Sequence, residues 1–174
     1  MLGRTVIEKT EIDEMVGRIA KEIEKDFGPG SPVFVGVLKG CVFFLTDLVR
    51  QISSPLEIDF IQVSSYGSGT SSSGTVVLVK DITADVRGRD VYLVEDIVDT
   101  GITLSDVVEM IRARHPRSVR IVSLLSKPSR RKIDVDIAYL GAEIDDVFVV
   151  GYGLDHAEQY RNLSDIRELI PESE

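Results

Sequence analysis

The sequence is poor in cysteine and lacks any long apolar run, and both absences restrict the setting in which the protein can work. Cys41 is the only cysteine among 174 residues, so no intrachain disulfide can form, and we expect it to fill space in the core. The N-terminal residues lack the apolar segment of a signal peptide, and no later stretch is long enough to span a membrane. These features predict a cytoplasmic protein.

Basic residues are also scarce. The chain has 20 Lys and Arg residues against 29 Asp and Glu residues, which gives a formal net charge of -9. Such a charge repels a phosphate backbone and argues against nucleic acid as the main partner. An anionic small molecule would need local devices, such as a metal ion or a helix N-terminus.

Tryptophan is absent, and the hydrophobic residues that are present favour a single α/β domain over residues 1–174. Val and Ile supply much of the hydrophobic content, as is typical of buried strands. Strand-like and helix-like segments alternate, which predicts a largely parallel sheet with helices on both faces. Thr10 and Asp13 are spaced like a capping box at the first helix. We expect a helix at residues 11–27, a short helix whose apolar face covers 42–52, and a third helix with its apolar stripe at 104–111 and its end at Pro116. We expect strands at 32–38, 56–63, 75–79, 91–94, 119–125, 137–140 and 147–150.

A stretch of Gly and Ser at residues 64–74 has almost nothing to bury. It is either an ordinary hairpin loop or a lid over a binding site, since loops of this length are uncommon inside compact domains. Composition alone favours neither interpretation.

The polar residues after the strand at 91–94 carry the strongest functional signal. Ligands of parallel sheets bind beyond the carboxyl ends of the strands, and Glu95 and Asp96 stand at such an end. Adjacent carboxylates suit hydrogen bonds to a sugar diol or the coordination of a hard cation. The segment Thr100-Gly101-Ile102-Thr103 opens the next helix, where free amides and hydroxyls can surround a phosphate. The alternative is a strand followed by an ordinary helix cap.

Two common phosphate-binding motifs are excluded. The segment lacks the Gly-Lys-Ser/Thr ending of a Walker loop, and His156 stands where a dinucleotide fingerprint starting at Gly151 needs its third glycine. Instead, Val94-Glu95-Asp96-Ile97-Val98-Asp99-Thr100-Gly101 resembles the phosphoribosyl pyrophosphate motif of type I phosphoribosyltransferases, and most of all their hypoxanthine-guanine branch.

The resemblance implies the type I phosphoribosyltransferase fold, which is a largely parallel twisted sheet flanked by helices, with a small hood and a flexible lid. The lid would cover about residues 64–75. The hood would combine the N-terminal segment with roughly residues 127–174.

The resemblance also implies roles for the residues of the main motif. Glu95 and Asp96 would hold the ribose hydroxyls, and Asp99 would lie beside N7 of the purine as a hydrogen-bond partner or general base. Some relatives carry Lys at the position of Ile102, so the phosphate site here would depend more on backbone amides. The residues expected around the 5'-phosphate are Thr100, Gly101, Ile102 and Thr103.

Three further segments resemble the family in chain order. Leu38-Lys39-Gly40 is similar to the pyrophosphate loop, and Ser65-Tyr66 is similar to the start of the catalytic lid, which keeps water from the reacting ribose. Lys127 matches the lysine that contacts the 6-oxo group of the base, a contact that favours 6-oxopurines over adenine. The alternative is that Lys127 is a surface charge in the basic run of Arg130, Arg131 and Lys132.

After Leu38-Lys39-Gly40 and Ser65-Tyr66, the third of these segments is residues 148–155, which resembles the purine-specificity region. Phe148 would stack on the base, and Arg161 would face the pyrophosphate. The residues expected to meet the purine are Ile97, Lys127, Phe148, Val149 and Asp155. The residues expected to hold magnesium are Glu95, Asp96 and Asp155.

These roles together imply a magnesium-dependent enzyme of purine salvage. It would transfer the phosphoribosyl group of phosphoribosyl pyrophosphate to N9 of hypoxanthine or guanine and release pyrophosphate. Relatives form dimers and tetramers, so we expect a homo-oligomer. Two alternatives stay open: a regulator that senses phosphoribosyl pyrophosphate without catalysis, and an enzyme of the same family that prefers xanthine or adenine.

Overall fold

A computed structural model describes residues 1–65 and 76–170. Its main element is a six-stranded sheet in the order β4-β3-β2-β5-β6-β7, in which every neighbouring pair is parallel except β3 and β4. The strands are β2 (Val33–Leu38), β3 (Glu57–Ser65), β4 (Val76–Lys80), β5 (Asp90–Val98), β6 (Ser118–Ser126) and β7 (Ile137–Glu143). The predicted parallel α/β sheet is therefore confirmed.

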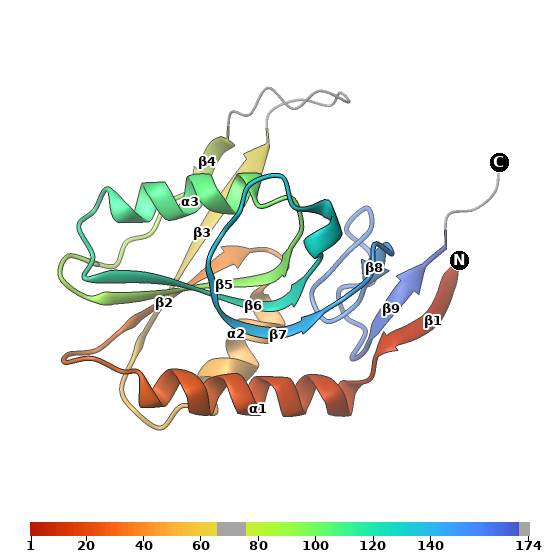
Figure 1. Cartoon of the computed structure of the whole chain (residues 1–174), viewed down its shortest axis with the longest axis horizontal. Coiled ribbons are helices and arrows are strands. Elements are labelled where there is room, and N and C mark those ends of the chain that lie inside the picture. Colours follow the sequence, from red (N-terminus) through yellow and green to blue (C-terminus); the bar gives the residue numbers. More distant parts are fainter. Residues whose placement is uncertain (66–75, 171–174) are drawn as a thin grey trace.

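Helices cover both faces of this sheet. The helices α1 (Lys9–Lys25) and α2 (Val42–Val49) lie on one face, and α3 (Ile102–Arg112) lies on the other (Figure 1). Within the described residues, no helix is both long and apolar enough to cross a membrane.

The two faces have separate hydrophobic cores because successive side chains of a strand point to opposite faces. On β2, Phe34 packs with the cluster under α1 and α2, whereas Val33 and Val35 pack with the cluster under α3. This alternation makes the apolar run of β2 buried on both sides, as parallel strands between helix layers are.

A smaller sheet in the order β1-β9-β8 lies beside the main sheet (Figure 1). Its strands are β1 (Leu2–Ile7), β8 (Val149–Val150) and β9 (Ile166–Leu169), and β1 and β9 were not predicted. The range expected for the hood, 127–174, covers both β8 and β9. That range includes β7, which pairs with β6 as a strand of the main sheet.

The first helix begins two residues before the predicted start, at Lys9. Glu8 is the N-cap residue, and Glu11 completes a capping box by accepting a hydrogen bond from the Glu8 amide at 2.8 Å. The predicted box at Thr10 and Asp13 is therefore wrong. The carboxylate of a glutamate has taken the capping role that a threonine hydroxyl was expected to fill.

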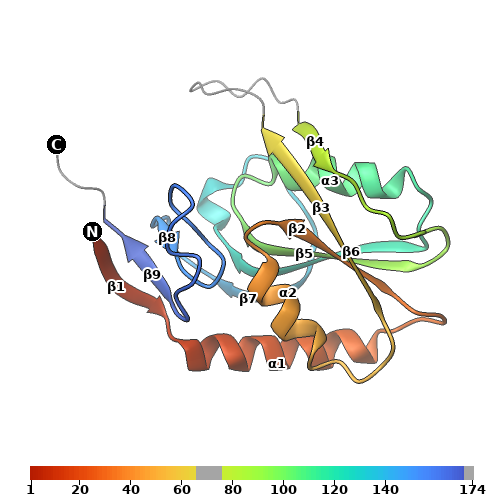
Figure 2. The ribbon, with the colours of Figure 1, turned by 180° about the vertical axis from the view of Figure 1, so that it is seen from behind.

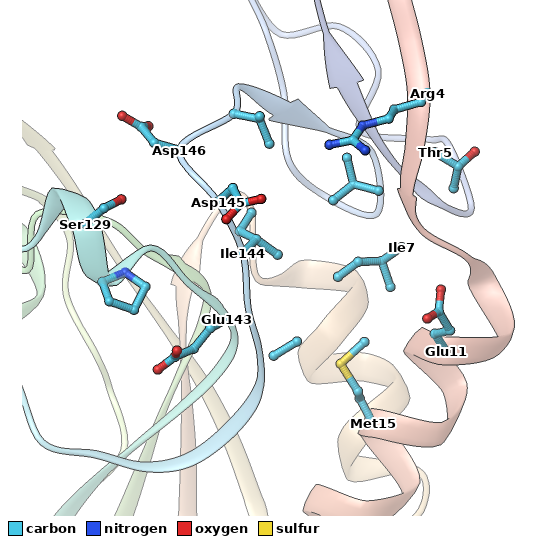
Figure 3. Close-up of a pocket in the computed structure, with 14 residues that line it drawn as sticks. Arg4, Thr5, Ile7, Glu11, Met15, Ser129, Glu143, Ile144, Asp145 and Asp146 are labelled. Carbon is cyan, nitrogen blue, oxygen red and sulfur yellow. The ribbon is translucent and has the colours of Figure 1, made fainter.

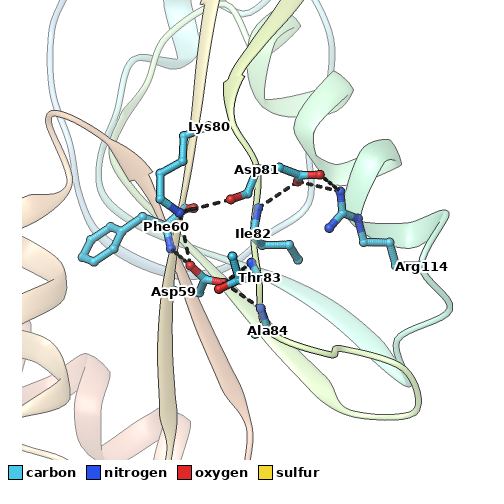
Figure 4. A network of polar contacts seen from close by, with 8 residues as sticks. All are labelled: Asp59, Phe60, Lys80, Asp81, Ile82, Thr83, Ala84 and Arg114. Carbon is cyan, nitrogen blue, oxygen red and sulfur yellow. Dashed lines mark hydrogen bonds and ion pairs between the residues drawn. The ribbon is translucent and has the colours of Figure 1, made fainter.

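A buried carboxylate ties the edge strand pair together. Asp59 on β3 accepts hydrogen bonds from the backbone amides of Thr83 at 2.6 Å and Ala84 at 2.8 Å, just beyond β4 (Figure 4). Burial alone would raise the pKa of Asp59. The amides of Ala84, Phe60 and Thr83, together with Lys80, outweigh that effect and lower the pKa to about 2.

Candidate active site

Three neighbouring parallel strands of the main sheet end at the same edge. β2, β5 and β6 lie side by side, and their carboxyl ends point toward the side of the molecule on which the small sheet lies (Figure 2). The segments that follow these strands carry three of the predicted motifs. They are Leu38-Lys39-Gly40, which starts at the last residue of β2, then Asp99 to Thr103 after β5, and Lys127 after β6.

The acidic pair lies inside the end of β5 and not after it. The predicted strand at 91–94 continues to Val98 because its pairing with β6 continues, with Glu95 opposite Ser123 and Val98 opposite Ser126. Burial raises the pKa of Glu95 well above the usual carboxyl range, and the charge of Asp96 adds to this effect. Burial also raises the pKa of Asp96. A cation or hydrogen-bond donors nearby would stabilise the ionised pair.

The turn after β5 leaves backbone amides available at the start of α3. Gly101 is the N-cap residue and adopts a left-handed conformation with φ of 80°. A Cβ atom there would collide with the carbonyl oxygen of Ile133, so only glycine fits. The carbonyl of Thr100 accepts hydrogen bonds from the amides of Lys132 at 2.9 Å and Ile133 at 3.0 Å, which hold the turn in place.

The loop after β2 approaches the acidic pair closely. The peptide bond between Leu38 and Lys39 is cis. A Cβ atom at Gly40 would overlap the carboxylate of Asp96, and a Cβ atom at Gly153 would overlap the carbonyl oxygen of Gly40. Gly40 is therefore enclosed between the end of β5 and the segment that follows β8.

A cavity of about 270 Å³ joins these segments. Leu38 at the end of β2, Glu95 from β5 and Thr103 from α3 all line it, so the structure brings residues of two predicted motifs to one space. The predicted residues that line it are Leu38, Glu95, Ile97, Asp99, Thr100, Gly101 and Thr103.

Lys127 follows β6, whose end is paired with the end of β5 that leads to Asp99. The backbone amide of Lys127 donates a hydrogen bond to the carbonyl of Val98 at 3.0 Å. Lys127 as a whole is only 5% exposed. Burial lowers the pKa of Lys127, while the charge of Asp99 acts in the opposite direction. The interpretation of Lys127 as an exposed surface charge is therefore wrong.

Asp99 itself has a cationic neighbour. The Nε atom of Arg130 lies 3.0 Å from Oδ1 of Asp99, yet within the described residues that oxygen accepts no hydrogen bond. An oxygen left in this state can accept a proton or a hydrogen bond from a ligand.

Four of the other residues expected at the purine or pyrophosphate belong to β8 or its flanking segments: Phe148, Val149, Asp155 and Arg161. Phe148 is 49% exposed and contacts His156 edge to face, with ring centroids 5.6 Å apart. Val149 is buried in β8. The Nη2 atom of Arg161 lies 2.8 Å from Oδ1 of Asp155, and its charge lowers the pKa of Asp96, so Arg161 lies near both carboxylates.

Comparison with known proteins places this site in a family. A family model described as a phosphoribosyl transferase domain matches residues 7–157. The chain is 46% identical over 170 residues to the hypoxanthine-guanine phosphoribosyltransferase of Bacillus subtilis (strain 168), which covers 98% of this chain and 94% of the relative. The chain belongs to the phosphoribosyltransferase family.

Other relatives agree with this assignment. A hypoxanthine-guanine phosphoribosyltransferase of Staphylococcus aureus (strain Mu50) is 42% identical over 171 residues, with 98% of this chain and 96% of the relative covered. A crystal structure of a hypoxanthine-guanine phosphoribosyltransferase from Bacillus anthracis has a TM-score of 0.93 at 41% identity, and covers 98% of this chain and all of that one. The predicted family and type I fold are thus confirmed.

This phosphoribosyltransferase contains site neighbours that the sequence did not reveal. Arg130 was named only as a neighbour of Lys127 in a basic run and was given no role at the site, yet it pairs with Asp99. Glu158 was not singled out, yet its carboxylate lies 3.1 Å from Nζ of Lys39. Arg130 is three residues after Lys127, which could have been a signal; nothing in the sequence marked Glu158.

The structure does not gather the predicted magnesium ligands into one cluster. Among residues 1–65 and 76–170, no group of three or more His, Cys, Asp or Glu side chains could hold a metal ion. Glu95 and Asp96 are together, whereas Asp155 is paired with Arg161. Ser65 is the last residue of β3, and Tyr66 lies outside the described residues, as does most of the predicted lid.

A cavity larger than the one at the strand ends lies elsewhere. It measures about 770 Å³ and lies between β1, the start of α1 and the segment after β7. Figure 3 shows Ile7, Met15 and Ile144 on one part of its wall, with Asp145 and Asp146 nearby. None of the predicted site residues lines it. The smaller cavity at the strand ends is the better candidate for the active site because predicted site residues line it.

Proposed function

We propose that this phosphoribosyltransferase transfers the phosphoribosyl group of phosphoribosyl pyrophosphate to N9 of hypoxanthine or guanine. The products would be IMP or GMP and pyrophosphate. The observation that carries the proposal is the strand end, turn and helix start from Glu95 to Thr103. This segment places two acids, Glu95 and Asp99, and the open amides at the start of α3 around one cavity.

The proposed position of the sugar phosphate follows from charge. The amides at the start of α3 can donate to the 5'-phosphate, and the positive end of the helix dipole favours an anion there. Glu95 and Asp96, whose ionised forms are disfavoured by burial, can accept hydrogen bonds from the ribose hydroxyls. Because Gly101 admits no side chain, the phosphate can approach the backbone closely.

The proposed choice of base depends on Lys127. A protonated lysine donates hydrogen bonds only, so it pairs with a 6-oxo group and not with the 6-amino group of adenine. Its burial excludes water from the contact and strengthens it. Phe148, half-exposed beside β8, offers a ring on which a purine can stack.

Asp99 is proposed to serve the reaction at the purine. Its Oδ1 atom accepts no hydrogen bond from the described residues, so it is available to a proton on N7. In this role it would stabilise positive charge that develops on the base as N9 attacks C1' of the ribose. Arg130, 3.0 Å away, would hold the carboxylate in position.

Magnesium is proposed as the cofactor. Its ligands are hard oxygen atoms, and it is often held by one or two carboxylates together with the oxygens of a phosphate substrate. Glu95, Asp96 and Asp155 supply such oxygens without forming a closed cage, and this donor set fits an ion that arrives with phosphoribosyl pyrophosphate. When bound, the ion would neutralise the departing pyrophosphate. Lys39 and Arg161 would hold the same group from the protein side.

We also propose the remaining features that the resemblance implied. The chain would be a single domain over residues 1–174, with a hood from the N-terminal segment and roughly residues 127–174 and a lid at about residues 64–75. It would be cytoplasmic and would assemble into a homo-oligomer.

The test is direct. The protein is incubated with magnesium, phosphoribosyl pyrophosphate and one of hypoxanthine, guanine, xanthine or adenine, and nucleotides are separated by chromatography. We expect nucleotide with hypoxanthine or guanine, and little with adenine. If calorimetry shows that phosphoribosyl pyrophosphate binds but no base gives product, the proposal fails and a sensing role replaces it.

A further inference from the structure

Glu158 lies between the two cations assigned to pyrophosphate. Its Oε2 atom accepts a hydrogen bond from Nζ of Lys39 at 3.1 Å and lies 3.4 Å from Nη2 of Arg161. Lys39 follows β2 of the main sheet, whereas Arg161 lies in the segment between β8 and β9 of the small sheet. A carboxylate of the protein therefore bridges the same two side chains that the proposed function gives to the departing group.

The backbone around Glu158 is built to hold it there. Ala157 and Glu158 both have left-handed conformations, with φ of 50° and 63°, which residues with a side chain adopt rarely. The amide of Glu158 donates to Oδ2 of Asp155 at 2.8 Å. His156 and Gln159 close the turn through reciprocal backbone hydrogen bonds at 3.2 and 3.0 Å. Unfavourable backbone of this kind persists where the surrounding structure maintains it, often at functional sites.

Glu158 carries negative charge where pyrophosphate would bring more. The hydrogen bond from Lys39 lowers the pKa of Glu158, so its carboxylate is ionised at neutral pH. Two anions cannot share Lys39 and Arg161 without repulsion. The side chains of Lys39 and Glu158 are 53% and 64% exposed, so this contact can open without disturbing the core.

Arg161 has one N–H donor that pairs with none of the described residues. Its Nη1 atom donates to the carbonyl of Gly153 at 2.7 Å, and its Nη2 atom faces Asp155 and Glu158. Among the described residues, its buried Nε atom has no hydrogen-bond partner.

We propose that Glu158 is an internal counter-ion that competes with the pyrophosphate group for Lys39 and Arg161. It would weaken the binding of pyrophosphate and of phosphoribosyl pyrophosphate, and it would help the product pyrophosphate to leave. This inference depends on the proposed function, because it takes Lys39 and Arg161 as the pyrophosphate site.

The substitution Glu158→Gln tests the inference, with Glu109→Gln as a matched control. Glu109 is also an exposed glutamate that pairs with an arginine three residues later, with Oε1 2.9 Å from Nη1 of Arg112. Both substitutions remove one negative charge, but Glu109 lies near the far end of α3 from the phosphate turn. Magnesium pyrophosphate is titrated into each protein by calorimetry. Since an exposed ion pair contributes little, we expect roughly threefold to tenfold tighter binding for Glu158→Gln and no change for the control.

Kinetics supply a second readout. The KM for phosphoribosyl pyrophosphate should fall by a similar factor in Glu158→Gln, while the KM for hypoxanthine should stay the same. A merely structural role would not separate these two constants. Glu158→Ala should move the affinity in the same direction, and thermal unfolding of each variant checks that it is folded.

The outcomes are distinguishable. Equal affinity of the wild-type protein and Glu158→Gln overturns the inference and leaves the proposed function intact. Weaker binding by Glu158→Gln also overturns it, because the carboxylate would then assist the anion or its magnesium ion. If the wild-type protein binds neither pyrophosphate nor phosphoribosyl pyrophosphate, the proposed function itself fails.

Discussion

Replacing Asp59 by Asn should destabilise the protein far more than a single surface charge would. Oδ2 of Asp59 accepts hydrogen bonds from the amides of Thr83 and Ala84, and Oδ1 accepts one from the amide of Phe60 at 2.7 Å. Asparagine has only one oxygen, so its NH₂ group must face at least one of these donors. The buried amide that it faces would lose its partner.

The magnitude follows from the pKa of Asp59. Lowering it from 3.8 to about 2 corresponds to about 2 kcal/mol of stability. With an unpaired amide added, we expect Asp59→Asn to lose about 2 to 4 kcal/mol of unfolding free energy at pH 7. The side chain is 10% exposed, so solvent screens this effect little.

The pH dependence has a definite sign. Because the folded pKa lies below the unfolded one, the contribution is complete above about pH 4 and disappears as the pH falls toward about 2. Urea unfolding at pH 7 and pH 3 measures it. The difference in unfolding free energy between the wild-type protein and Asp59→Asn should be smaller by about 1 kcal/mol at pH 3 than at pH 7.

The matched control is Asp13→Asn. The Asp13 side chain is 53% exposed and pairs with Lys9 at 2.7 Å on the surface of α1, so its loss should cost under about 1 kcal/mol. The reasoning is refuted if both variants lose the same free energy at pH 7, or if the Asp59→Asn gap does not change with pH.

Three further predictions concern the candidate site. Asp99→Asn should lower turnover roughly 10²- to 10⁴-fold and leave phosphoribosyl pyrophosphate affinity largely unchanged, by steady-state kinetics and calorimetry; near-normal turnover would remove Asp99 from its role. Lys127→Gln should lower kcat/KM for hypoxanthine roughly 10- to 100-fold, because a hydrogen bond from a charged donor is lost; an unchanged value would exclude contact with the 6-oxo group. Gly101→Ala should reduce the unfolding free energy by about 1 to 3 kcal/mol and weaken phosphoribosyl pyrophosphate binding. The reason is that φ of 80° is unfavourable for alanine and the carbonyl of Ile133 leaves no room for a methyl group. Wild-type stability of this variant in urea would contradict this account.

The alternation of strands and helices was predictable because it depends on neighbours in the chain. Apolar residues on both faces of β2 and an apolar stripe on α3 mark buried elements whatever lies around them. The end of β5 was missed for a related reason. The polar side chains of Glu95 and Asp96 indicated a loop, but the parallel pairing of β5 with β6 keeps both residues in the strand.

The small sheet was not predictable in the same way. β1 pairs with β9 through contacts such as Leu2 with Leu169, so its partner lies at the other end of the chain. Its residues are mostly half-buried, and no clear alternation marks them. A strand whose stability comes from a distant partner has a weak local signal.

The sequence by itself determined the family, the sheet class and the content of the strand-end loops, since each rests on residues adjacent in the chain. Only the tertiary structure decided which charges meet. Arg130 lies against Asp99, Glu158 reaches Lys39 across 119 positions, and Asp59 caps amides 24 and 25 residues away. Periodicity is set by the local backbone, but an ion pair depends on where distant segments come together.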